Sequence, residues 1–140
     1  MARSRSAAFA IAVAAVLWSG CGGLMQPDEL ARSLGTLESS AAEGALLARD
    51  VARDRTKASF VRAHARDLGE VADHEAEKLQ DASADGEVRV RKSAAVDLAG
   101  RISETLGKIQ TGPGSEEEGR SAERSLTRLG DRAARLAEGL

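Results

Sequence analysis

The stretch TGPGSEEE, residues 111–118, decides the fold of this 140-residue chain, because it interrupts a sequence that is otherwise rich in strong helix formers. Residues 112–114, Gly-Pro-Gly, predict the end of one helix, since proline lacks an amide donor and glycine favours turns. Ser115 and Glu118 then predict a capping box, in which both side chains accept hydrogen bonds from backbone amides at the start of the next helix. The stretch therefore separates two helices, and it argues against a coiled-coil hairpin of two very long helices.

On both sides of this break, apolar residues recur every three or four positions, the spacing that places them on one face of a helix. Downstream, the face holds Ala122, Leu126, Leu129, Ala133, Leu136 and Leu140. Upstream, Pro27 and the two acidic residues after it predict a helix start, because proline suits a first turn and acids complement the helix dipole. That first helix has an apolar face from Leu30 to Val51 and is expected to end near Asp54.

Two further helices are predicted between these. A helix capped by Thr56 or Ser59 is expected to run to about Asp81, and a third follows the turn ASADGE, residues 82–87, with a serine or aspartate of that turn as its cap. Their inward faces are predicted to hold Val61, His64, Leu68, Val71, Ala72, Glu75 and Leu79 in the second helix, and Ala95, Leu98, Ile102 and Ile109 in the third, with Val88 and Leu106 beside that face. Four helices joined by short turns predict an all-α, antiparallel up-down-up-down four-helix bundle over residues 27–140.

Each predicted helix contains a Leu-Gly pair, although a glycine inside a helix costs about 1 kcal/mol relative to alanine. The glycines allow neighbouring helices to approach closely, or they reflect the glycine-rich composition of the chain, and the sequence leaves both interpretations open. The pairs lie at residues 34–35, 68–69, 106–107 and 129–130.

The first twenty residues differ from the rest and are typical of an export signal. Arg3 and Arg5 precede an uncharged apolar run, residues 7–18, which as a helix would reach only about 18 Å and would not span a hydrocarbon layer of roughly 30 Å. Residues 1–20 are therefore expected to be removed. The alternatives are an uncleaved signal anchor and a buried helix, and the second is disfavoured because the run has no amphipathic face.

The end of this segment and the next residue, Trp18-Ser19-Gly20-Cys21, resemble the cleavage box of bacterial lipoprotein signals. That box has two small residues and then cysteine, and Trp18 stands where an aliphatic residue is usual. The resemblance implies cleavage after Gly20, a diacylglyceryl group on the Cys21 sulfur and an acyl chain, such as palmitate, on the new amino terminus. Two or more acyl chains hold a protein stably on a membrane. The alternative is an accidental cysteine beside an ordinary secretory signal.

This interpretation divides the chain into a lipoprotein signal peptide (1–20), a lipidated tether (21–26) and the bundle (27–140). Gly22, and not aspartate, follows the cysteine, and in this the chain resembles the outer-membrane class of lipoproteins if the cell has two membranes. Loss of residues 1–20 removes two basic residues and no acidic one, so the net charge changes from −2 to about −4. Lipid, and not attraction to anionic headgroups, is therefore expected to hold the protein.

The composition excludes several classes of function. The near balance of 20 basic and 22 acidic residues argues against a nucleic-acid binder, and the single cysteine excludes an internal disulfide. After the signal, Phe60 is the only aromatic residue, so no aromatic platform for stacking sugars or bases is expected. No nucleophile motif, phosphate-binding loop or triad pattern is present, and we expect neither an enzyme nor a cofactor.

A metal site is likewise not expected. The di-iron motif of helical bundles needs Glu three residues before His, whereas valines precede both histidines at that spacing. A weak alternative is a site formed from His64, Asp67, Glu70 and His74, of which the last three share one helix face. A solvated acidic face is the favoured interpretation of that stripe, and a hydrogen-bonded core histidine that of His64.

Glu75 falls on the inward face of the second helix, where an unpaired carboxylate would be costly. In an antiparallel hairpin that turns near residue 83, Arg91 lies at the same height as Glu75 and also points inward. The sequence therefore predicts an ion pair between Glu75 and Arg91 that sets the register of the two helices.

Taken together, these features predict a non-enzymatic structural or interaction module, anchored by lipid to the membrane and able to bind an envelope protein. Its composition resembles that of small helical lipoproteins from the envelopes of high-GC bacteria. The alternative is a small helical bundle that binds a ligand or a metal ion.

Overall fold

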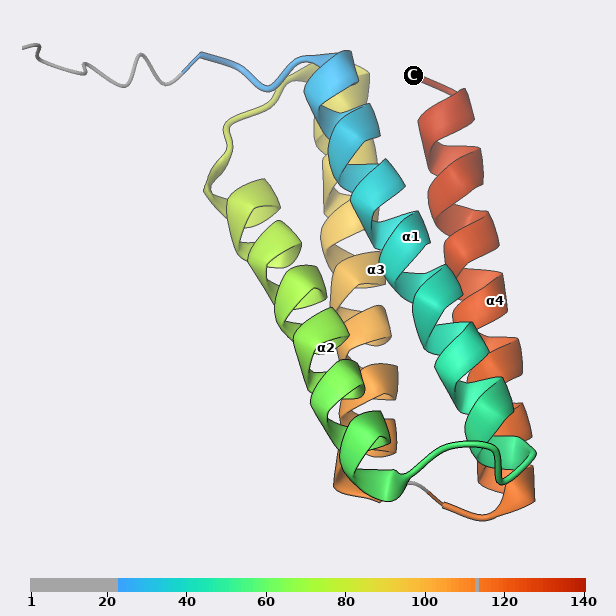
Figure 1. The fold of residues 1–140 in the computed structure, drawn as a ribbon. Helices are drawn as coiled ribbons and strands as arrows, with labels where there is room; N and C mark the ends of the chain where they lie inside the picture. The colour runs from blue at the N-terminus through green and yellow to red at the C-terminus, as the bar shows by residue number, and fades with distance from the viewer. Residues whose placement is uncertain (1–22, 113) are drawn as a thin grey trace, which may run out of the picture.

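The computed structural model describes residues 23–112 and 114–140, and Figure 1 shows the helices of this part joined by short turns. They are α1 (Pro27–Ala52), α2 (Ala58–Asp81), α3 (Gly86–Thr111) and α4 (Glu116–Glu138). Within the described residues there is no strand. Successive helices run in opposite directions, so the predicted all-α, up-down-up-down four-helix bundle is confirmed.

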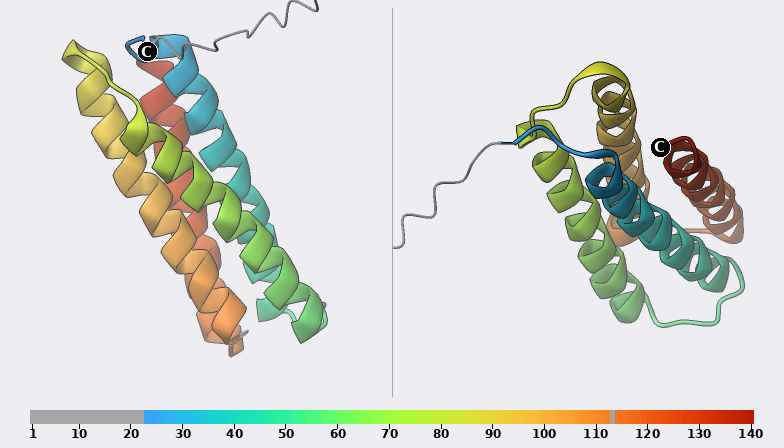
Figure 2. Two further views of the ribbon diagram at one scale, coloured as in Figure 1. Left: turned by 90° about the vertical axis from the view of Figure 1, so that its left-hand side faces the viewer. Right: turned by 90° about the horizontal axis from the view of Figure 1, so that it is seen from above.

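The helices pack as two close pairs, α1 with α4 and α2 with α3, and α1 also contacts α3 across the bundle. Figure 2 shows α2 and α3 on one side of the molecule and α1 and α4 on the other. Large apolar side chains from all four helices fill the space between them, and burial of each stabilises the fold by about 1.5–3 kcal/mol. Those fully removed from solvent include Leu30, Leu34, Leu37, Val61, Leu79, Leu98, Ile102, Leu106 and Leu126.

Helices α1 and α4 approach each other closely at Gly119, in the first turn of α4. A Cβ atom on Gly119 would lie 2.8 Å from the Ala52 amide nitrogen and 2.9 Å from the Ala48 carbonyl oxygen, so a larger residue would displace a backbone. A Cβ atom on Gly44 would lie 2.7 Å from the Leu106 side chain, which is flexible and able to shift. Gly119 therefore sets the distance between α1 and α4 at this point.

The glycines of the four Leu-Gly pairs do not serve this purpose. A Cβ atom would meet open space at Gly35 and Gly107, and only ordinary van der Waals contacts at Gly69 and Gly130. Close approach of helices therefore does not explain these pairs, and the glycines where the helices do approach closely lie outside them.

The ends of the helices agree only in part with the predicted caps. At the start of α4 the capping box is confirmed, because the Glu118 amide donates to the Ser115 hydroxyl oxygen at 3.3 Å and the Ser115 amide donates to the Glu118 carboxylate at 2.7 Å. The predicted serine or threonine cap of α2 is wrong, since Lys57 occupies that position without a side-chain capping bond. Asp85 holds the cap position of α3, also without such a bond. Side-chain capping therefore defines the start of α4 but not those of α2 and α3.

The buried faces of α2 and α3 differ from the predicted ones at three residues. Val71 is exposed and His64 is half-buried, because the contact of α2 with its neighbours runs through Ala65 and Leu68. On α3, Leu106 lies in the core and not beside it. The periodicity thus identifies the helices correctly but leaves the rotation of α2 about its axis uncertain by part of a turn.

Candidate functional site

One end of the bundle, which we call the tether end, holds the start of α1, the α2–α3 turn and the C-terminus (Figure 1). Met25 is buried there, and its amide donates to the Ser83 carbonyl oxygen in the α2–α3 turn at 2.8 Å. Among the described residues, the packed structure therefore begins at Met25, two residues before α1. The predicted lipidation site, Cys21, lies outside the described residues.

Two cationic side chains connect helices at the tether end. Lys92 Nζ donates to the carbonyl oxygens of Leu79 and Ala82, both at 2.9 Å, and so satisfies carbonyl groups that the end of α2 leaves without partners. Arg91 Nη1 donates to the Leu136 carbonyl oxygen at 3.3 Å, which joins the start of α3 to the end of α4. Sequence reasoning missed both links, because they depend on which helices become neighbours.

The ion pair predicted between Glu75 and Arg91 is wrong in its partners. Glu75 is buried as predicted, with 8% of its surface exposed, but it accepts a hydrogen bond from Lys78 Nζ at 3.0 Å. Arg91 pairs with Glu87 at 3.4 Å and extends toward α4. A lysine one turn away on the same helix reaches the Glu75 carboxylate without crossing the bundle, and this local pair forms instead.

The acidic stripe considered as a metal site lies on the surface of α2. Asp67, Glu70 and His74 are all exposed, as the solvated-face interpretation predicts. Arg66 lies 3.5 Å from the Asp67 carboxylate and 3.6 Å from that of Glu70, and it neutralises part of their charge. In the part of the chain that the structure describes, no three His, Cys, Asp or Glu side chains are grouped so as to hold a metal ion.

His64, the remaining residue of that alternative, has separate surroundings. Its ring stacks on that of Phe60 with centroids 5.5 Å apart, and its Nε2 lies 3.8 Å from a carboxylate oxygen of Glu43 on α1. With 37% of its side chain exposed, His64 is half-buried at the α1–α2 boundary and is not the core histidine that the sequence predicts.

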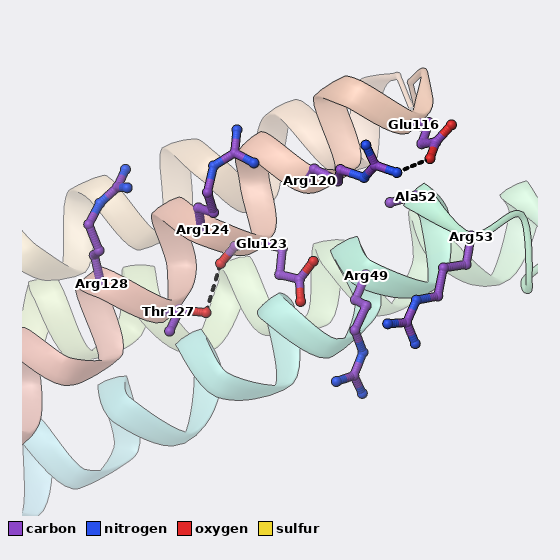
Figure 3. A pocket seen from close by; sticks show the side chains of 9 residues that line it. All are labelled: Arg49, Ala52, Arg53, Glu116, Arg120, Glu123, Arg124, Thr127 and Arg128. Carbon is purple, nitrogen blue, oxygen red and sulfur yellow. Dashed lines mark hydrogen bonds and ion pairs between the residues drawn. The ribbon is translucent and has the colours of Figure 1, made fainter.

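The opposite end, which we call the far end, carries an open cleft between the last turns of α1 and the first half of α4. We call it the arginine cleft. It has a volume of about 560 Å³. Figure 3 shows its lining residues, which are Arg49, Ala52, Arg53, Glu116, Arg120, Glu123, Arg124, Thr127 and Arg128.

The arginine cleft is positively charged in an acidic chain. Five arginines and two glutamates give its lining a net charge of +3, whereas the whole chain has a net charge of −2. Arg120 pairs with Glu116, but among residues 23–112 and 114–140 no carboxylate oxygen lies within 4.0 Å of a guanidinium nitrogen in the other four arginines. The Nε atom of Arg49 is buried without a hydrogen-bond partner. The cleft therefore has cationic donors that the fold does not use.

Sequence reasoning missed this cleft, although part of its signal is visible. Arg120, Arg124 and Arg128 follow one another at intervals of four residues, which aligns them along one side of a helix. Arg49 and Arg53 have the same spacing at the end of α1. Their meeting depends on the contact between α1 and α4, which joins residues far apart in the sequence.

Outside the cleft, Glu104 and Lys108 form an exposed ion pair on α3. Lys108 Nζ donates to the Glu104 carboxylate at 2.8 Å, and this hydrogen bond, together with the positive charge of the lysine, lowers the pKa of Glu104. A lowered pKa keeps the Glu104 carboxyl ionised at neutral pH, as is usual for a surface ion pair and opposite to what a general acid requires.

No known protein family matches the chain, and neither a curated protein nor a solved structure matches it. Among the helices described, none combines the length and the apolar character that crossing a membrane requires. Functional inference therefore depends on the residues of this chain alone, and on the two ends of its bundle.

Proposed function

We propose that the chain is an exported protein, held on a membrane by lipid attached to Cys21, and that its four-helix bundle is a non-enzymatic interaction module of the cell envelope. The observation that carries this proposal is the order of residues 1–21: a basic start, a short apolar run, two small residues and a cysteine. In a two-membrane cell, Gly22 favours the outer membrane.

The arrangement of the tether end supports the proposal. Met25 is fixed to the bundle, and only three residues separate it from Cys21, a reach of about 14 Å at full extension. A lipid on Cys21 would therefore hold the tether end close to the membrane. Exposed apolar side chains at this end, Leu24, Val90 and Leu140, suit a position beside lipid.

Membrane fractionation and intact mass of the full chain, expressed in a bacterial host beside Cys21→Ser, test the proposal. We expect the wild type in the membrane fraction, with a mass that lacks residues 1–20 and includes diacylglyceryl and acyl groups. We expect Cys21→Ser to lose both the lipid and the membrane association. Ser19→Ala keeps a small residue before the cleavage point and serves as the matched control, which should behave as the wild type.

Two results would overturn the lipid anchor. One is an equal distribution of wild type and Cys21→Ser between the soluble and membrane fractions. The other is a wild-type mass that carries no lipid. Either result would leave the bundle itself unaffected, because the fold depends on residues after Cys21.

A further inference from the structure

We propose that the arginine cleft is a binding site for anions that carry several phosphate groups. The site is formed by Arg49 and Arg53 from α1 and by Arg120, Arg124 and Arg128 from α4. Guanidinium groups bind phosphate oxygens through paired N–H donors, and they remain charged at every physiological pH. This inference goes beyond the membrane anchor and does not depend on it.

The local charge favours an anion with more than one negative charge. The net charge of +3 at the cleft lies within a chain of opposite overall charge, so the positive potential is concentrated there. A single carboxylate would neutralise only part of it, and Glu123, already in the cleft, does not pair with the arginines beside it within 4.0 Å. A phosphate monoester carries between one and two negative charges at neutral pH and matches this site better.

The spread of the side chains favours several phosphate groups over one. In Figure 3 the guanidinium groups of Arg124 and Arg128 extend outward from α4, those of Arg49 and Arg53 extend from α1, and the Glu123 carboxylate lies between the two helices. The five cations are therefore spread over both sides of the cleft and do not converge on one point. An extended ligand with phosphate groups at intervals would contact more of them than a single phosphate ion.

Arg49 supplies a second indication of a ligand. Its Nε atom is buried and has no hydrogen-bond partner, and a buried donor left in this way costs about 1–3 kcal/mol. Rotation of the side chain toward an anion in the cleft would give that atom an acceptor. Aromatic side chains are missing from the lining, so recognition would depend on charge and not on stacking of a base or sugar.

The position of the cleft distinguishes between two sources of phosphate groups, soluble or polymeric phosphates and the headgroups of a membrane. Helix α1 has 26 residues and a length of about 39 Å, and it runs from the tether end to the cleft. A protein held by its tether end would carry the cleft away from the anchoring membrane. The expected ligand is therefore a soluble or polymeric phosphate, and the headgroups of a membrane are the second source of the same chemistry.

Isothermal titration calorimetry of the full chain in nonionic detergent, with inorganic tripolyphosphate as the probe, tests the site. We expect saturable binding that weakens with added salt, and a loss of about tenfold or more in affinity in Arg124→Gln/Arg128→Gln, which corresponds to about 1.4 kcal/mol or more for the two charge-assisted contacts together. Glu123→Gln should increase the affinity severalfold, because it removes a negative charge from the cleft.

Arg132→Gln/Arg135→Gln is the matched control, because it removes the same charge from the same helix at exposed positions outside the cleft. It should stay within about twofold of the wild type, the scale of a surface change in charge. An equal loss in this control would show that overall charge, and not the cleft, binds the anion. Such a loss would overturn the proposal, as would absence of binding in a folded wild type.

A second arm compares sedimentation with vesicles of phosphatidylglycerol and of phosphatidylcholine, using Cys21→Ser so that lipid on the protein cannot contribute. If the protein binds tripolyphosphate but not phosphatidylglycerol vesicles, a soluble source is supported. If it binds these vesicles and Arg124→Gln/Arg128→Gln abolishes that binding, a headgroup source is supported. Binding of poly-glutamate as tight as that of tripolyphosphate would contradict the preference for phosphate. The anchor is tested separately, because its failure changes fractionation and leaves the titration unchanged.

Discussion

The two ends of the bundle use cationic side chains differently. At the tether end, Lys92 and Arg91 donate hydrogen bonds to backbone carbonyl oxygens of α2 and α4. At the far end, five arginines line one cleft, and only Arg120 has a carboxylate partner in the described part of the chain. The contrast indicates that the cations of the tether end stabilise the fold, whereas those of the arginine cleft remain available to a ligand.

The packing of α1 against α4 explains how the far end presents its arginines. Arg49, Arg53 and Arg120 each directly follow a residue of the close contact at Gly119. Successive residues of a helix are about 100° apart around its axis, so these side chains emerge beside the contact. The glycine that brings the two backbones together therefore also sets the distance between the two rows of arginines.

The largest effect is expected from Gly119→Ala, which should destabilise the protein by about 2 kcal/mol because the new methyl group meets backbone atoms of α1. Denaturant unfolding followed by circular dichroism measures the change. Gly100→Ala is the control: open space surrounds this position inside α3, and helix propensity predicts a gain of about 0.5–1 kcal/mol. Equal stability of the two variants would show that Gly119 does not set the α1–α4 distance.

A smaller loss, about 2 kcal/mol at most, is expected from Met25→Ala at the tether end. The substitution removes a buried side chain, but the end of a bundle can partly collapse into the space. Leu24→Ala, the neighbouring exposed position, should change the free energy of unfolding by less than about 0.5 kcal/mol. If the two variants unfold alike, burial of Met25 does not stabilise the bundle.

The smallest change in the free energy of unfolding is expected from replacing a single cation, and one cation from each end is compared. Lys92→Met should lower the free energy of unfolding by about 1 kcal/mol, since it removes the donors that satisfy two carbonyl groups at the end of α2. Arg128→Met should leave it within about 0.5 kcal/mol of the wild type. A loss in Arg128→Met as large as that in Lys92→Met would mean that the cleft arginines also stabilise the fold.

The fold could be predicted because its signals are local. The break at residues 111–118 and the apolar repeats are short-range patterns, and both led to the correct helices. The partner of Glu75 could not be predicted in this way. Two residues at the same height on neighbouring helices need not pair, because a long side chain such as that of Arg91 can extend in another direction. The arginine cleft was missed for a related reason: its two halves are separate in sequence and become one site only when α1 packs on α4.

The neighbours of each glycine in the fold could not be predicted from the sequence for the same reason. A Leu-Gly pair is visible in the sequence, yet whether its glycine faces open space, as at Gly107, or an ordinary neighbour, as at Gly130, depends on the rotation of each helix. The residues next to Gly119 in the sequence do not indicate that the backbone of another helix lies against it. Only the packing of α4 on α1 shows where the absence of a side chain matters.

Lipid on Cys21, as proposed, would hold the tether end at a membrane and leave the arginine cleft facing away from it. Nitroxide labels on single cysteines at Val90→Cys, near the tether end, and Arg55→Cys, near the far end, test this arrangement in membranes that contain the full chain, because a lipidated Cys21 has no free thiol. We predict that dissolved oxygen, which concentrates in lipid, relaxes the label at position 90 more strongly, and that a water-soluble nickel chelate relaxes the label at position 55 more strongly. Equal accessibility of the two labels, or the reverse order, would show that the tether end does not lie at the membrane.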